Sequence, residues 1–269
     1  MSDNPLRLSR TIFIAAMGLC LWQAAADPAV SGALITPAPT ANVSDQTPAD
    51  FLDMVGQRTK ARWRLLFRPP PPTPPTNRGR AALILGSLLG DSFLVWQAAD
   101  SQQFRNNNQD VLTYCRMLGL GEKLMPRLMA QGKMAEDSEW KDLRHEIVDG
   151  HQVLVRLLRE QKDDDLALMI DLGLWLRVLE IASTVVADTS AVELRPLCIG
   201  SPAILQEMRD DFSRLSASKR EEAILKRIGI SIHEISTLWK DADKVPPTQI
   251  QVVMTQEKFK ELMRALMDK

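Results

Sequence analysis

The sequence predicts an all-α fold, a helical bundle preceded by a signal peptide and a proline-rich linker. Three observations lead to this prediction. The 269 residues are rich in Leu, Met and Ala but only 5% aromatic, which favours helices over sheets. Several long stretches repeat apolar residues at helical spacing. A run of prolines separates these stretches from the N-terminal part of the chain.

Composition and charge indicate a globular chain without a nucleic-acid partner. Hydrophobic residues make up 45% of the sequence and charged residues 25%, as in ordinary globular domains. The net charge is −1, from 33 Lys and Arg against 34 Asp and Glu. Such a chain has no basic field that attracts nucleic acid. We therefore expect no nucleic-acid binding.

The first 26 residues have the three parts of a secretory signal peptide. Arg7 and Arg10 precede an uncharged apolar run, Thr11–Trp22, and three alanines follow, ending at Ala26. This order predicts cleavage after Ala26 and a location in the periplasm or outside the cell. The apolar run is shorter than the roughly 20 residues that span a bilayer. An uncleaved signal anchor remains the alternative.

Residues 27–46 predict a disordered linker, and residues 47–68 an amphipathic helix. The first range is mostly Ala, Pro, Thr, Ser and Val with almost no charge. In the second, Thr47 can cap a helix and Pro48 suits its first position. Its polar faces are strongly basic. Such a helix can lie on an anionic membrane or an acidic partner. We expect instead that it docks on the core as an ordinary surface helix. The basic residues are Arg58, Lys60, Arg62, Arg64 and Arg68.

Residues 69–77 predict a proline-rich linker before an all-α domain over residues 78–269. Pro69 to Pro72 cannot continue a helix and favour an extended polyproline conformation. A semi-rigid spacer of this kind predicts that the parts on either side move independently.

The run from Ala81 to Ala99 predicts a central helix that is apolar on every side. Its length also fits a membrane span, and Gly86 and Gly90 have the spacing of closely paired membrane helices. Asp91 argues against a span, because an Asp at mid-membrane costs about 2.5–3.5 kcal/mol. We therefore expect a buried core helix whose glycines let a neighbouring helix approach closely.

An amide-rich stretch, residues 100–110, follows this helix. It predicts a turn and a cap before a helix over 111–118. The alternative is a polar lip that binds sugar or peptide groups, with Trp96 as a stacking platform. Cys115 lies in this predicted helix. It either forms a disulfide with Cys198, which an exported protein permits, or both cysteines are buried thiols.

The C-terminal half predicts further helices. Residues 138–162 show the clearest helical spacing, and residues 166–187 form a second nearly apolar helix. A helix starts at Ser201–Pro202. Ser218 and Ser231 each begin a capping-box pattern, and a last helix follows Pro247, with a short strand possible over 249–254.

A few charged residues on the two apolar helices are the candidate ligand-binding residues. Arg177 cannot lose its charge, so we expect it to be buried and paired with Glu180, Asp171 or Asp91. His145 and Asp149 share a helix face but form too small a set to predict a metal site. No catalytic motif is present. The candidate residues are Asp91, Trp96, Asp171, Arg177 and Glu180.

Two apolar segments carry a resemblance to known proteins. They are DDDLALMIDLGLWLRVLE, residues 163–180, and ALILGSLLGDSF, which begins at Ala82. The region from Ala81 to Glu180 resembles exported helical bacterial proteins of unknown function. This resemblance implies export and helices but no particular site.

The sequence thus predicts an exported cell-envelope protein that binds a partner protein or a small ligand without catalysis and without a cofactor. The alternatives are an enzyme with a site inside the bundle and a membrane-tethered structural protein. A deep polar pocket with shifted titratable groups would favour the enzyme. An exposed apolar groove would favour the binding module.

Overall fold

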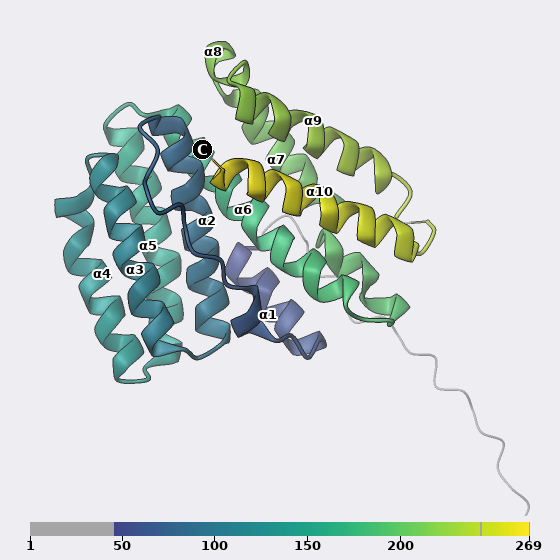
Figure 1. Cartoon of the computed structure of the whole chain (residues 1–269), viewed down its shortest axis with the longest axis horizontal. Helices are drawn as coiled ribbons and strands as arrows, with labels where there is room; N and C mark the ends of the chain where they lie inside the picture. Colours follow the sequence, from purple (N-terminus) through teal and green to yellow (C-terminus); the bar gives the residue numbers. More distant parts are fainter. Residues whose placement is uncertain (1–45, 243, 269) are drawn as a thin grey trace, which may run out of the picture. The chain divides into compact units, whose positions relative to one another are not determined.

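The structure of the chain, a computed structural model, describes residues 46–242 and 244–268 (Figure 1). The predicted signal peptide and residues 27–45 of the predicted linker lie outside these ranges. Within them every regular element is a helix, so the all-α prediction is confirmed. The elements are α1 (Pro48–Arg58), η2 (Trp63–Leu66), α2 (Arg78–Gln97), α3 (Ser101–Met117), α4 (Gly121–Glu136), α5 (Trp140–Glu160), α6 (Asp164–Ala187), η3 (Val192–Cys198), α7 (Pro202–Arg214), α8 (Ala217–Arg220), α9 (Ala223–Leu238) and α10 (Gln249–Met267).

The two apolar helices, α2 and α6, pack against each other at the centre. A Cβ atom on Gly86 would lie 2.1 Å from the Ile170 carbonyl oxygen, and one on Gly173 would lie 2.1 Å from that of Leu83. The two backbones are therefore in direct contact, and only glycine fits at either position. Of the described helices, α2 alone is long and apolar enough to cross a membrane, and 89% of its most apolar stretch is buried inside the protein.

Two groups of helices cover this central pair. Helices α3, α4 and α5 pack on the side of α2, and α7, α9 and α10 pack on the side of α6 (Figure 1). Their buried side chains join one hydrophobic core that runs through both groups. Burial of this apolar surface is the main force that holds the helices together.

The amide-rich stretch is helical, contrary to the predicted turn. Helix α3 begins at Ser101, and Asp100 caps it by accepting a hydrogen bond from the Gln103 amide. Asn107 is fully buried and donates to the Leu88 carbonyl and to Ser92 Oγ of α2. Asn108 likewise donates to the Leu128 carbonyl of α4, so these two amides bond to neighbouring helices rather than to their own backbone.

Three local predictions in the C-terminal half are wrong. Ser218 lies inside α8 and Ser231 inside α9, so neither begins a capping box, and residues 249–254 belong to α10 rather than to a strand. The capping box of this region is formed by Thr248 and Gln251 instead. Buried Val252 and Phe259 share a helix face there, and this tertiary packing outweighs the β-propensity of the local sequence.

The predicted helix over 47–68 is divided in the structure. Helix α1 ends at Arg58, Thr59 is extended, and the short η2 follows. Phe51, Leu52 and Val55 are completely buried in the common core. These contacts contradict the prediction that the parts before and after residues 69–77 move independently. Residues 69–77 themselves form no helix.

The two cysteines are separate buried thiols, so of the two interpretations the disulfide is excluded. Cys115 lies on α3 and Cys198 on η3. Burial raises the pKa of the Cys115 thiol to about 12 and raises that of Cys198 as well. Neither thiol therefore forms a reactive thiolate near neutral pH.

Candidate functional site

Arg177 is buried and paired, as the sequence predicts. Its exposed fraction is 2%, and its guanidinium donates to both neighbouring carboxylates. The Nε and Nη2 atoms lie 2.8 and 2.6 Å from Asp91 Oδ1, and Nη1 lies 2.6 Å from Glu180 Oε2. Burial raises the pKa of Asp91 to about 6, a rise that the charge of Arg177 limits.

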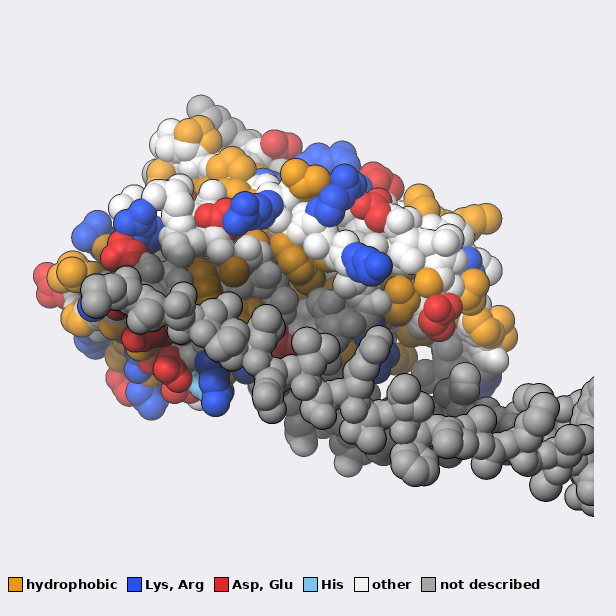
Figure 2. Space-filling model, turned by 90° about the horizontal axis from the view of Figure 1, so that it is seen from below, with side chains coloured by type: hydrophobic (Ala, Val, Ile, Leu, Met, Phe, Trp, Pro, Cys, Tyr) orange, Lys and Arg blue, Asp and Glu red, His pale blue; other side chains and the backbone are white. Residues whose placement is uncertain are grey.

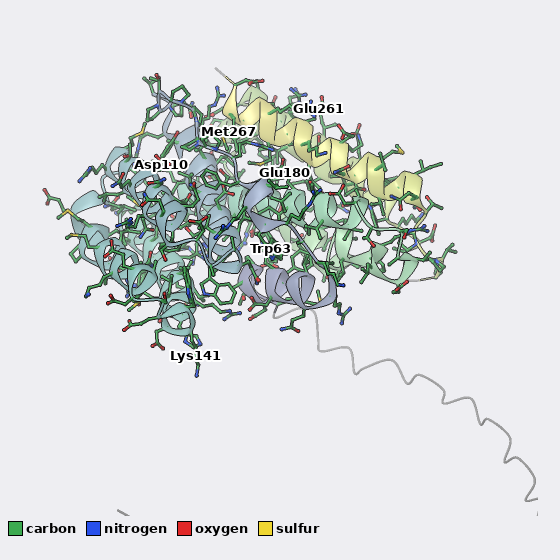
Figure 3. All side chains as sticks on the ribbon, turned by 60° about the horizontal axis from the view of Figure 1, so that its bottom comes forward. Trp63, Asp110, Lys141, Glu180, Glu261 and Met267 are labelled. Carbon is green, nitrogen blue, oxygen red and sulfur yellow. The ribbon has the colours of Figure 1, made fainter. Side chains whose placement is uncertain are left out.

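The segment that carries η2 completes this buried network. Arg177 Nη2 also lies 2.5 Å from the Leu66 carbonyl oxygen, and Arg68 forms an ion pair with Glu180. Figure 3 shows Glu180 in the interior beside this segment, whereas Lys141 and Glu261 lie at the periphery. Two arginines and two carboxylates balance each other, and each has a protein partner. The network is therefore structural, since it leaves no charge for a ligand.

The other two candidate residues lie elsewhere, so the five predicted residues do not form one site. Asp171 precedes Arg177 by six residues, which turns it about 120° round the helix. It contacts His151 instead, with 2.8 Å between Nε2 and Oδ1. The Trp96 indole donates to the Trp140 carbonyl at 2.6 Å, so its nitrogen is engaged in packing. Only Asp91, Arg177 and Glu180 are brought together.

Asp171 opens onto a polar recess between α5, α6 and α7, which we call the α5–α7 pocket. Its volume is about 340 Å³. The N-terminal end of α1 closes one side. The pocket combines carboxylates, a histidine, two arginines and an indole. Its described lining residues are Gln46, Thr47, Pro48, His151, Arg159, Asp171, Leu174, Trp175, Glu207, Asp211 and Arg214.

Two carboxylates in this pocket, Glu207 and Asp211, have raised pKa values. Partial burial of its otherwise exposed side chain raises the pKa of Glu207, and the charges of Asp211 and Asp171 raise it further. Burial likewise raises the pKa of Asp211, with Asp171 adding to the rise and Arg214 opposing it. Arg214 is ion-paired with Asp211. These raised pKa values accompany an excess of carboxylates over arginines in the lining, which a bound cation would offset.

The apolar wall of the pocket is held rigidly. Trp175 is only 5% exposed and packs against Phe51 of α1, with ring centroids 6.3 Å apart. Leu174 beside it is almost fully buried. The indole therefore holds a fixed position beside the charged groups, with little of its surface open to a ligand.

Sequence reasoning found only Asp171 of this pocket. His151, Glu207 and Asp211 come from helices whose register against α6 is set by tertiary packing. One usable signal was present, because Glu207 and Asp211 are four residues apart and so share a face of α7. His145 and Asp149 do not line the pocket. Among the described residues, no cluster of three His, Cys, Asp or Glu could hold a metal ion.

The chain matches no protein-family model, no curated protein and no solved structure. The α5–α7 pocket is the candidate site because of its chemistry. A protonated amine could lie between its carboxylates, and Arg159, which forms no ion pair with a described residue, could bind an anionic group of the same ligand.

Proposed function

We propose that this protein is an exported binding protein that holds a small ligand with a protonated amine in the α5–α7 pocket. The observation that carries the proposal is the convergence of three carboxylates from α6 and α7 on one recess walled by Trp175. Proposed export is supported by the order of charged, apolar and small residues over 1–26.

The dimensions and charges of the pocket support a small ligand. Its volume of about 340 Å³ is at the lower end of the roughly 300–1,000 Å³ of small-molecule sites. The three carboxylates exceed the two arginines in number, which favours a cationic group. Arg159 and Arg214 would in turn favour a ligand that also carries a carboxylate, such as an amino acid.

Thermal unfolding tests this proposal with simple probes. We expect lysine or putrescine to raise the melting temperature of the protein, since a ligand that binds only the folded state stabilises it. Glu207→Gln should abolish the rise because it removes an exposed carboxylate from the pocket. Glu193→Gln is the matched control, since it removes an exposed carboxylate outside the pocket. Equal rises in both variants would refute the site.

The pH dependence of binding gives a second test. The pKa values of Glu207 and Asp211 are raised, and an amine binds best when both carboxylates are ionised. Affinity should therefore increase as the pH rises through the titration of these groups, until the amine loses its proton. Isothermal titration calorimetry in buffers of different ionisation heat should also show protons released on binding.

A second candidate function is an enzyme that transfers protons in the same pocket. The His151–Asp171 pair is the specific observation in its favour, because a carboxylate that orients an imidazole is a common arrangement of a general base. Glu207 and Asp211, with raised pKa values, could act as acids. A panel of amine-containing substrates tests it, since turnover that survives His151→Gln would exclude this role.

A further inference from the structure

A second recess, lined by residues near the end of α1 and in η2, has the opposite excess of charge. We call it the basic groove. Its volume is about 570 Å³, and it lies between residues 58–66 on one side and the end of α6 with the start of η3 on the other. No residue that lines the α5–α7 pocket lines this groove, so the two recesses are distinct.

Three cations of the groove have no partner within the described part of the chain. Arg58, Lys60 and Arg62 are exposed, line the recess, and form no ion pair there with a described residue. The next two cations differ, because Arg64 lies 3.3 Å from Asp100 and Arg68 is ion-paired with Glu180. The three cations that line the groove are thus available to pair with a bound partner.

Apolar and hydroxyl groups accompany these cations. Leu65 is 70% exposed, although it is a large hydrophobic residue. Leu66, Val185 and Leu194 line the groove with it, and Thr189 and Ser190 add hydroxyl groups. Asp188 is the only carboxylate among the described lining residues. The groove therefore offers an apolar strip beside an excess of positive charge.

The wall that carries the cations is fixed to the core. The Thr59 hydroxyl donates to the Val55 carbonyl at 2.7 Å where α1 ends. At the far end Arg177 donates to the Leu66 carbonyl at 2.5 Å. The cations are thus presented by an anchored backbone, so a partner need not pay the full entropy of ordering this segment.

We infer that the basic groove binds an acidic, partly hydrophobic polypeptide segment of another protein. Charge complementarity selects an acidic segment, and exposed Leu65 selects one with apolar side chains. A bilayer fits less well, because a flat surface cannot enter a recess with two walls. Nucleic acid fits less well too, since the described lining residues include no aromatic side chain on which a base could stack. The protein surface seen in Figure 2 also mixes charges of both signs.

Fluorescence anisotropy of the full chain tests this inference with a labelled peptide of alternating Glu and Leu residues. The triple variant Arg58→Gln, Lys60→Gln, Arg62→Gln should bind it about tenfold more weakly, as three lost surface charge contacts imply. The matched control is Lys123→Gln, Lys141→Gln, Arg209→Gln, which changes the net charge equally. Its exposed cations lie outside the groove and form no ion pair with a described residue. The control should bind within about twofold of the unchanged protein.

Several outcomes would overturn the inference. A peptide of alternating Gln and Leu that binds equally well would show that charge is not recognised. Equal binding by both triple variants would place the interaction elsewhere. The protein could also bind phosphatidylglycerol vesicles but not the peptide. If only the groove variant then loses vesicle binding, this surface is a membrane contact.

Circular dichroism melting curves of both variants should match that of the unchanged protein, since all six residues are exposed.

Discussion

Replacing Arg177 with Leu should destabilise the protein strongly. The substitution removes the donor of two hydrogen bonds to Asp91 and leaves that carboxylate 1% exposed without its partner. Glu180 keeps an ion pair with Arg68, so one carboxylate rather than two is stranded. Breaking a buried pair in this way costs about 3–5 kcal/mol. For a domain of this size that corresponds to a fall of about 6–20 °C in melting temperature.

A double variant separates the stranded charge from lost packing. Replacing Arg177 and Asp91 together, each with Leu, removes both charges and leaves Glu180 paired with Arg68. This variant should be more stable than Arg177→Leu alone, because a well-packed apolar pair substitutes for a buried ion pair at little cost. Urea unfolding followed by circular dichroism measures both changes in the free energy of unfolding.

The same variant makes a prediction about pH. Burial already raises the pKa of Asp91 to about 6, and loss of Arg177 removes the main opposing charge and raises it further. A carboxyl with a raised folded pKa destabilises the protein at high pH, and this cost disappears as falling pH protonates the group. The stability deficit of Arg177→Leu should therefore shrink between pH 8 and about pH 5 by at most about 1.4 kcal/mol per unit. A deficit that is constant over this range, or a double variant less stable than the single one, would refute the reasoning.

Three further predictions follow from other features. Gly86→Ala should prevent normal packing of α2 on α6, whereas Gly132→Ala, whose Cβ meets nothing closer than 4.0 Å, should be neutral or stabilise by up to about 1 kcal/mol in thermal unfolding. Cys115 and Cys198 should react with a thiol reagent only after denaturation, so rapid labelling of the native protein would contradict their burial. Mass spectrometry of the exported protein should find a chain that begins after Ala26, and an intact Met1 would reject cleavage there.

The central helices could be predicted from the sequence because their signals are strong and local. A run of apolar residues around Gly86 and Gly90, and another around Arg177, favours buried helices, and Asp91 argues against the membrane span that the first run also fits. The pairing of Arg177 followed from chemistry, since its permanent charge requires acceptors. The identity of one partner, Glu180, followed from helical spacing.

Other features depended on tertiary contacts that no local pattern contains. The amide-rich stretch is helical because Asn107 bonds to α2. The sequence of residues 100–110 does not show how this stretch packs against α2, so the bond could not be predicted from it. The break of α1 after Arg58 arises where the chain turns to place Leu66 against Arg177. The α5–α7 pocket requires three helices to meet, so its His151 and Glu207 could not be joined to Asp171 by spacing along the chain.

The docking of α1 on the central pair also determines the order in which the chain can complete its core. A ribosome releases α1 first, but α1 packs on both α2 and α6, and α6 follows only after α3, α4 and α5. The apolar side chains of Phe51, Leu52 and Val55 therefore stay exposed during most of synthesis. Such non-local closure slows folding and leaves the chain open to factors that bind unfolded segments. Under the proposed export, a chain whose core closes this late would stay unfolded long enough to be transported across the membrane.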